Sequence, residues 1–347
     1  MLQKHYQHSA MTSINTLEQF LTLAGTQFRV FDMGRRVSPL DTNQFHQFEN
    51  GEIAYPYPRS GHAWIGLLFW QPAGVKQHYV WFLKLPLDEQ GKINPAARSQ
   101  FLQLVVEALG QDPTVEISKE QHQRLASNPF VFTPSQEKMA VFNARVRVTL
   151  AQPASVHLQS VQDYFGGQLG WGNWQQLGLQ GLADYCARLP KSQQTQLAKA
   201  ITQLPSEPAA ALINVAEHFD MPAAVNDAWH QRAQASSEEL AKITALRGLA
   251  GCPELLTPAL AKLLATPLSQ DALIVIAARL WHGLDHANLM AWLEQLARFP
   301  GNLFNQLYMD LVAIPSLRPS VLAALRDPNR SQQLSVAIGH LMSALRG

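Results

Sequence analysis

The apolar positions at the start of the chain predict one helix and then one strand. Over residues 15–24 apolar side chains recur at intervals of three and four, as on one face of a helix. Gly25 follows where a C-terminal cap belongs. Residues 28–33 are rich in bulky apolar side chains and predict a short strand.

The clearest strand signal lies further along the chain. Residues 63–70 form a continuous apolar run, and residues 78–85 are dense in aromatic and aliphatic side chains. The turn-forming residues 71–74 separate them, which predicts an antiparallel hairpin. Because the apolar character is almost continuous, we expect helices to cover both faces of this sheet.

Start signals predict four more helices in the first half of the chain. The starts are Asp41 with Gln44, Pro95, Ser118 with Gln121, and Thr133-Pro134 with Gln136. Gly51 and Gly110 would end the first two. For the first of them a hairpin turn at Asn50-Gly51 is the alternative.

From residue 153 onward the spacing is helical, with almost no strand signal. Proline breaks recur, and pairs of helices are predicted to start near Gln175, Pro208, Ser237, Ser269, Gly301 and Ser331. These starts are about 30 residues apart, a spacing used by stacked helical repeats. The segment Ala245–Leu249 followed by Pro253–Leu256 resembles a HEAT-like unit, although an irregular helical bundle would also give regular breaks.

The predicted fold class is therefore an α+β region with a short antiparallel sheet, followed by an all-α, HEAT-like solenoid. We place the boundary at the Ala151–Ala154 stretch. Residues 1–152 would form the α+β domain, with residues 1–10 disordered, and residues 153–347 the helical-repeat domain.

Composition and charge narrow the classes of function. The chain has 347 residues, 47% of them hydrophobic, and a net charge of +1. This balance excludes an intrinsically disordered chain and disfavours nucleic-acid binding, which depends on basic surfaces. Two cysteines, Cys186 and Cys252, suit a reducing compartment. With no leader signal and no apolar run long enough for a bilayer, we expect a cytoplasmic protein without a membrane partner.

His282-Gly-Leu-Asp-His286 is the segment that most resembles a metal site. Two histidines four residues apart share one face of a helix, as in inverted zinc-peptidase motifs. However, Asp285 is shorter than the glutamate of that motif, and Gly283 can end one helix while Asp285 caps the next. We therefore predict no metal, no cofactor and no catalytic residue from sequence motifs.

Two other segments provide candidate binding residues. Phe165–Trp174 is rich in glycine and lacks the Lys or Ser/Thr of a phosphate loop, so Trp171 and Trp174 either pack at a turn or present a flat contact surface. The adjacent Arg35 and Arg36 follow the first strand. Such a pair either clamps an anion or is bound to local acids.

Four strings together resemble a known family. They are Phe31–Val37, Trp81–Glu89, Lys138–Phe142 and Gly170–Gln175. In this order they are similar to an uncharacterised gammaproteobacterial family of about 340 residues that is known only as a domain of unknown function. The resemblance implies a bacterial protein and brings no activity, cofactor or site residue.

The function predicted from the sequence is a protein-interaction or scaffold module that binds a protein partner through its helical-repeat surface. The alternative is an enzyme or small-ligand-binding protein with a site at the junction of the two domains. For that alternative Arg35, Arg36, Trp171 and Trp174 are the candidates.

Overall fold

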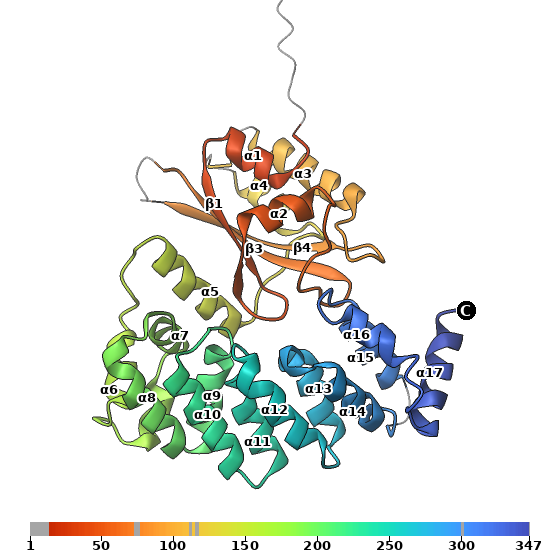
Figure 1. The fold of residues 1–347 in the computed structure, drawn as a ribbon. Coiled ribbons are helices and arrows are strands. Elements are labelled where there is room, and N and C mark those ends of the chain that lie inside the picture. Colours follow the sequence, from red (N-terminus) through yellow and green to blue (C-terminus); the bar gives the residue numbers. More distant parts are fainter. Residues whose placement is uncertain (1–13, 73–76, 111–112, 115–117, 300–301, 347) are drawn as a thin grey trace, which may run out of the picture.

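The computed structural model describes residues 14–72, 77–110, 113–114, 118–299 and 302–346. An N-terminal region of one antiparallel sheet with helices precedes a region built from helices (Figure 1). The predicted fold class, α+β followed by all-α, is confirmed. The predicted disorder of residues 1–10 lies outside the described residues.

The sheet has four strands in the order β2-β1-β3-β4. Their bounds are β1 (Gln27–Asp32), β2 (Ser38–Leu40), β3 (His62–Trp70) and β4 (His78–Pro86). β3 and β4 form the predicted hairpin, in which Ala63 pairs with Leu85. From Ile65 to Trp70 every side chain of β3 is buried, so both faces of the sheet are covered, as the apolar run predicts.

Five helices accompany the sheet. Their bounds are α1 (Leu17–Leu23), α2 (Thr42–Glu49), α3 (Pro95–Leu109), α4 (Lys119–Ala126) and α5 (Gln136–Thr149). Asp41 caps α2, which confirms the helix there, and Ser118 with Gln121 forms the predicted capping box of α4. The predicted start at Thr133-Pro134 is two residues early, because the Ser135 side chain caps α5.

Each face of the sheet packs against a different layer. One face contributes to a core with α1, α2 and α3. The other contributes Phe31 and Leu68 to a core that runs through α5 into the helical half, with the rings of Phe31 and Phe142 5.3 Å apart. Gly66 allows this close approach, since a Cβ there would lie 2.7 Å from the Phe142 ring. α5 therefore joins the sheet to the helical half.

The helical half consists of fourteen described elements. They are α6 (Leu158–Phe165), η1 (Trp171–Gln176), α7 (Leu179–Arg188), α8 (Lys191–Gln203), α9 (Ser206–Ala216), α10 (Ala223–Ala235), α11 (Glu239–Arg247), α12 (Pro253–Leu264), α13 (Gln270–Arg279), η2 (Trp281–Gly283), α14 (His286–Leu296), α15 (Leu303–Val312), α16 (Arg318–Ala324) and α17 (Gln332–Ala344).

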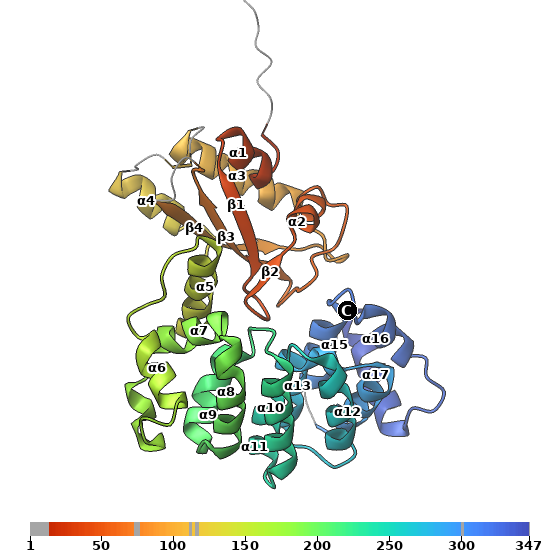
Figure 2. The ribbon, with the colours of Figure 1, turned by 60° about the vertical axis from the view of Figure 1, so that its left-hand side comes forward.

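The helices from α7 onward stack in two layers. Each odd-numbered helix contacts the next odd-numbered one, from α7 to α17, and each even-numbered helix contacts the next even-numbered one, from α8 to α16. The predicted pair starts lie within four residues of the starts of these odd-numbered helices. The stack follows an arc that opens toward the sheet (Figures 1 and 2). This pattern favours stacked repeats over an irregular bundle, while the likeness to HEAT units in particular stays a prediction.

Within the described part of the chain, no helix combines the length and the apolar character needed to cross a bilayer.

Gly248, at the end of α11, is expected to tolerate no side chain. A Cβ there would lie 2.4–2.7 Å from three ring atoms of Trp229, which is fully buried and cannot move aside. Gly248→Ala should therefore lower the free energy of unfolding by about 1–3 kcal/mol through overpacking. Gly339→Ala is the matched control, since its Cβ would meet nothing within 4 Å in the interior of α17. The control should raise stability by about 0.5–1 kcal/mol in urea unfolding, and equal effects of the two substitutions would contradict the packing argument.

Candidate functional site

The loop between β1 and β2, residues 32–38, reaches into the arc of the helical half. Its shape is set by Asp32, which is fully buried. The Asp32 carboxylate accepts hydrogen bonds from the backbone N–H groups of Gly34 and Arg35, each at 3.1 Å, and from the Tyr55 hydroxyl at 2.8 Å. On the other side the Lys138 Nζ of α5 donates to the carbonyl oxygens of Met33 and Gly34, each at 2.6 Å. These contacts fix the direction in which the following arginines leave the loop.

Arg35 fastens this loop to the C-terminal helices. Its Nε donates to the Pro58 carbonyl at 2.9 Å, and its Nη2 forms a 2.9 Å ion pair with the Asp310 carboxylate on α15. The guanidinium also lies 5.9 Å from the ring centre of Trp281. Because its side chain is 3% exposed and paired, Arg35 acts as a structural link between the two halves.

Arg36 and Val37 bind the segment that follows α9. The Arg36 Nε donates to the Glu217 carbonyl at 2.8 Å, and its Nη2 pairs with the Asp220 carboxylate at 3.0 Å. The Val37 N–H donates to His218 Nδ1 at 3.1 Å, so this imidazole accepts through Nδ1 and is uncharged. The Asp220 side chain is 84% exposed, which leaves this ion pair open to solvent.

Arg145 reaches the same segment from α5. Its Nη2 donates to the His218 carbonyl at 2.6 Å, and its guanidinium lies 4.6 Å from the centre of the Phe219 ring. Among the described residues no carboxylate lies within ion-pair distance of Arg145, and its buried Nε has no hydrogen-bond partner. The exposed Asp220 carboxylate acts on Arg145 only from beyond ion-pair distance and opposes part of the effect of burial, and a largely buried arginine without a contacting carboxylate is costly.

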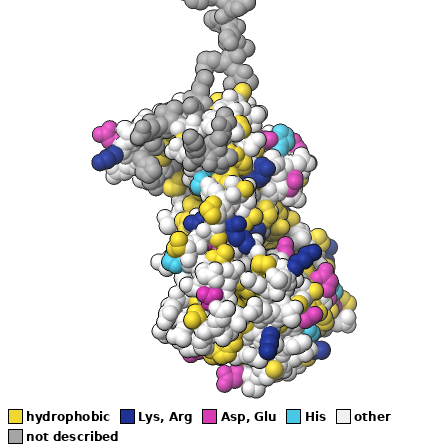
Figure 3. Space-filling view, turned by 90° about the vertical axis from the view of Figure 1, so that its left-hand side faces the viewer, with side chains coloured by type: hydrophobic (Ala, Val, Ile, Leu, Met, Phe, Trp, Pro, Cys, Tyr) yellow, Lys and Arg dark blue, Asp and Glu magenta, His cyan; other side chains and the backbone are white. Residues whose placement is uncertain are grey.

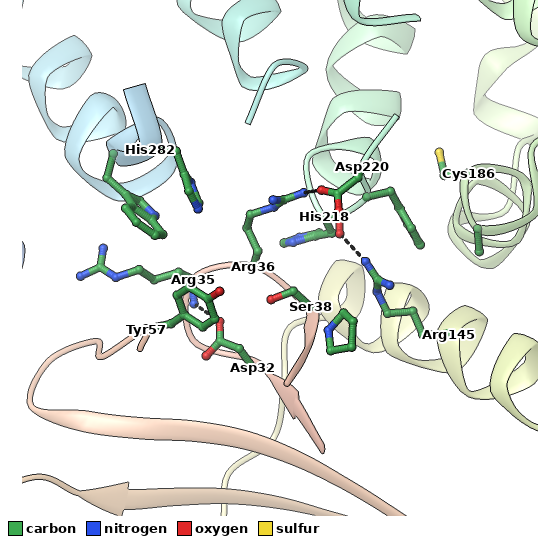
Figure 4. A pocket seen from close by; sticks show the side chains of 14 residues that line it. Asp32, Arg35, Arg36, Ser38, Tyr57, Arg145, Cys186, His218, Asp220 and His282 are labelled. Atoms are coloured by element: carbon green, nitrogen blue, oxygen red, sulfur yellow. Dashed lines mark hydrogen bonds and ion pairs between the residues drawn. The ribbon is translucent and has the colours of Figure 1, made fainter. Parts of the chain in front are cut away.

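Asp32, Arg35, Arg36, Arg145 and the segment from His218 to Asp220 line a cavity of about 410 Å³ at the junction of the two halves. Figure 4 shows Arg36 and Arg145 converging on the segment from His218 to Asp220, while Tyr57 and His282 lie toward the other end. The wall at that end is aromatic. The Tyr57 ring lies 6.1 Å from the Trp281 ring, and the His282 ring stacks on Trp281 at 3.5 Å. The size is in the range of small-molecule sites.

Three arginines and two aspartates line the cavity, so its formal charge is positive and we expect a positive electrostatic potential there. Burial, with Arg36 and Arg35 nearby, lowers the pKa of His282 to about 4. Burial and Arg36 lower the pKa of Arg145 to about 10, and burial with Lys138 and Arg279 holds the pKa of His218 well below its usual value. Figure 3 shows Lys and Arg side chains gathered at the narrow level between the two halves. Such a potential favours an anion.

Two further buried groups near the cavity have shifted pKa values. Burial raises the pKa of Asp32 to about 6, although Tyr55 and the loop N–H groups oppose the shift. Burial lowers the pKa of Lys138 to about 8. Clusters of such shifts in a cleft are typical of functional sites.

The structure brings together only part of the predicted site. Arg35 and Arg36 both line the junction cavity. Trp171 and Trp174 lie on η1, which packs against α6 and α9, and neither is among the described residues that line the cavity. The Trp171 ring packs 5.2 Å from Tyr164, so the turn-packing interpretation describes it. A ligand role for the two tryptophans stays a prediction.

The two histidines of the segment from His282 to His286 do not share a helix. Gly283 ends η2, and the Asp285 side chain caps α14 by accepting from the Asn288 N–H at 2.8 Å. This confirms the interpretation of a junction between helices. No group of three or more His, Cys, Asp or Glu side chains suited to a metal ion occurs among the described residues.

Several residues of the cavity could not be identified from the sequence. Arg145 lies on α5, His218 and Asp220 lie in the segment after α9, and they meet only through the fold. His282 belongs to the His282–His286 segment discussed above, but nothing in the sequence spacing joins it to Tyr57. The sequence feature that pointed to the cavity was the pair Arg35 and Arg36 after the first strand.

His282 is expected to make stability depend on pH. Its pKa is about 4 in the folded chain, against an ordinary value of 6.5, so below pH 6.5 the unfolded chain binds a proton that the folded chain does not. The free energy of unfolding should therefore fall as the pH falls toward 4, by at most about 3 kcal/mol from this group. In urea unfolding, the wild-type advantage over His282→Gln should shrink between pH 7 and pH 4. The exposed His340→Gln serves as the control, and an advantage that does not change with pH would contradict the assignment.

Comparison with known proteins gives one match. A family model described as "Protein of unknown function (DUF3549)" matches residues 12–342. No curated protein matches, and no solved structure matches.

Proposed function

Since the chain belongs to the DUF3549 family of proteins of unknown function, we propose its function from the geometry of the junction: it binds a small anionic ligand between its two halves. One observation supports this most strongly. Arg145 lines the junction cavity, largely buried, with no carboxylate within ion-pair distance among the described residues. An anion in the cavity would supply the contacting negative charge that the more distant Asp220 does not.

Arg36 is the second anion contact in this proposal. Its partner Asp220 is mostly exposed and can turn toward solvent when a ligand takes its place. Two arginines at one site match the planar, two-oxygen geometry of carboxylate and phosphate groups. Arg35 is not part of the binding set, because Asp310 already pairs with it.

The test is a thermal unfolding series with small anions. Phosphate, citrate and acetate are compared with chloride at constant ionic strength, and at least one should raise the Tm of the wild type. A ligand at about 100 times its Kd stabilises the folded state by about 2.7 kcal/mol. Arg145→Met should abolish the ligand-induced shift, whatever its effect on the starting Tm.

Arg298→Met is the matched control, because Arg298 is exposed and lies far along the stack at the end of α14. It should keep the full shift. If no anion stabilises the wild type, or if Arg145→Met keeps the shift, the proposed function is wrong.

A protein-interaction role for the helical-repeat surface, on a cytoplasmic bacterial protein, is the second proposal. The N-terminal loop already occupies part of the inner side of the arc, through Arg35, Arg36 and Val37. Support for a partner comes instead from the last three helices. Large apolar side chains there are 44–56% exposed, namely Met309, Leu322, Val336 and Leu345. A stoichiometric partner captured by a tagged copy should be lost when these four are changed to serine.

A further inference from the structure

The junction cavity has two chemically different ends, and this difference constrains the ligand. At one end Arg36 and Arg145 supply the positive charge. At the other end Tyr57 and Trp281 form an aromatic wall, with His282 stacked on the indole. A bare inorganic anion would contact only the first end and leave most of the 410 Å³ to solvent.

His282 adds a specific requirement at the aromatic end. Its Nδ1 is buried and has no hydrogen-bond partner among the described residues. Since burial and the nearby arginines keep this imidazole uncharged at neutral pH, one of its nitrogens donates and the other accepts. Because Nδ1 is buried, a ligand in the cavity can reach this ring only at its other nitrogen, Nε2, which has no hydrogen-bond partner among the described residues.

Tyr57 provides the surface that a ligand body can contact. It is partly exposed, whereas Trp281 behind it is 4% exposed and serves mainly as its support. Aromatic side chains hold flat rings by stacked or edge-to-face contacts, which add to the energy of burying apolar area. A saturated ring has no flat aromatic face and cannot make these stacked or edge-to-face contacts.

We propose, resting on the anion-binding function above, that the ligand is an aromatic acid: a planar ring against Tyr57, an anionic group at Arg36 and Arg145, and a polar ring substituent at His282. Tyr57 and His282 are then specificity-determining residues of the site. The cavity volume suits a monocyclic acid of this kind.

Calorimetric titration of the full-length protein tests this with four probes: acetate, cyclohexanecarboxylate, benzoate and hydroxybenzoate. We expect benzoate to bind at least tenfold more tightly than cyclohexanecarboxylate, and hydroxybenzoate more tightly than benzoate. Tyr57→Leu should reduce the benzoate-to-cyclohexanecarboxylate affinity ratio several-fold. His282→Phe should remove the advantage of hydroxybenzoate over benzoate. Arg298→Met should keep both ratios.

The outcomes separate the two proposals. If anions bind in an Arg145-dependent manner but benzoate and cyclohexanecarboxylate bind equally, the aromatic-acid proposal is overturned and anion binding stands. An affinity ratio that Tyr57→Leu does not change also overturns it. If none of the four probes binds, and neither phosphate nor citrate binds, both proposals are overturned.

Discussion

Replacement of Arg35 by alanine is expected to lower the free energy of unfolding by about 3–5 kcal/mol, the range for breaking a buried ion pair from one side. The substitution removes the bond from Nε to the Pro58 carbonyl and the 2.9 Å ion pair with Asp310. It also leaves the Trp281 ring without its cation. Since the Asp310 side chain is 26% exposed, water can solvate part of it, and the effect should lie at the lower end of the range.

A double-mutant cycle with Asp310→Asn provides the sharpest measurement of this link. Urea unfolding of both single variants and the double variant should give a coupling energy of at least about 1 kcal/mol. Arg35→Lys should recover little of the lost stability, because an ammonium group cannot donate to the Pro58 carbonyl and pair with Asp310 in the planar arrangement of a guanidinium. The exposed Arg326→Ala should be nearly neutral. Additive single effects would mean that Arg35 does not fasten the two halves through Asp310.

The second large effect is expected for Asp32→Ala, which should cost about 3–5 kcal/mol. The substitution removes the acceptor of three donors, the Gly34 and Arg35 N–H groups and the Tyr55 hydroxyl. Each buried donor left unsatisfied costs about 1–3 kcal/mol, partly offset because a buried carboxyl no longer has to lose its water. Anion binding should weaken as well, because this loop directs Arg36.

Asp32→Asn isolates the charge of the same group. Burial raises the folded-state pKa of Asp32 to about 6 from its ordinary value of 3.8. The resulting stabilisation is complete below pH 3.8 and is lost as the pH rises through 6, because the folded chain holds the proton more tightly. The stability advantage of the wild type over Asp32→Asn should therefore be larger at pH 4 than at pH 7. An advantage that grows with pH would show that Asp32 is ionised throughout.

The sequence allowed most of the fold to be predicted, because the decisive signals are local. The apolar run of residues 63–70, the cap at Asp41 and the proline breaks act within a few residues, and the structure follows each of them. The start of α5 was missed by two residues, because Ser135 was available beyond Pro134 and accepts from the Lys138 N–H. Thr133 and Ser135 are both capping residue types two positions apart, and the sequence alone does not show which of them begins the helix.

The site was much harder to predict, because its contacts join distant parts of the chain. Val37 meets His218 across 181 positions, and no local pattern records such a meeting. The arginine pair was noticed because two adjacent charges after a strand are unusual, yet the two play different roles. Both line the cavity, but Arg35 is buried and pairs with Asp310 on α15, whereas Arg36 pairs with the exposed Asp220. The two side chains diverge because residues 34–36 form a bend between β1 and β2.

The distance along the chain between the loop and its partners also has a consequence for biosynthesis. Asp310 follows Arg35 by 275 residues along the chain. At about 5–20 residues per second, a ribosome needs roughly 15–55 s to deliver the second after the first. Until the helical half has been made, Arg35 and Arg36 of the β1–β2 loop lack their partners Asp310 and Asp220 and stay hydrated. The junction between the two halves is therefore completed late in synthesis, after the sheet and α5.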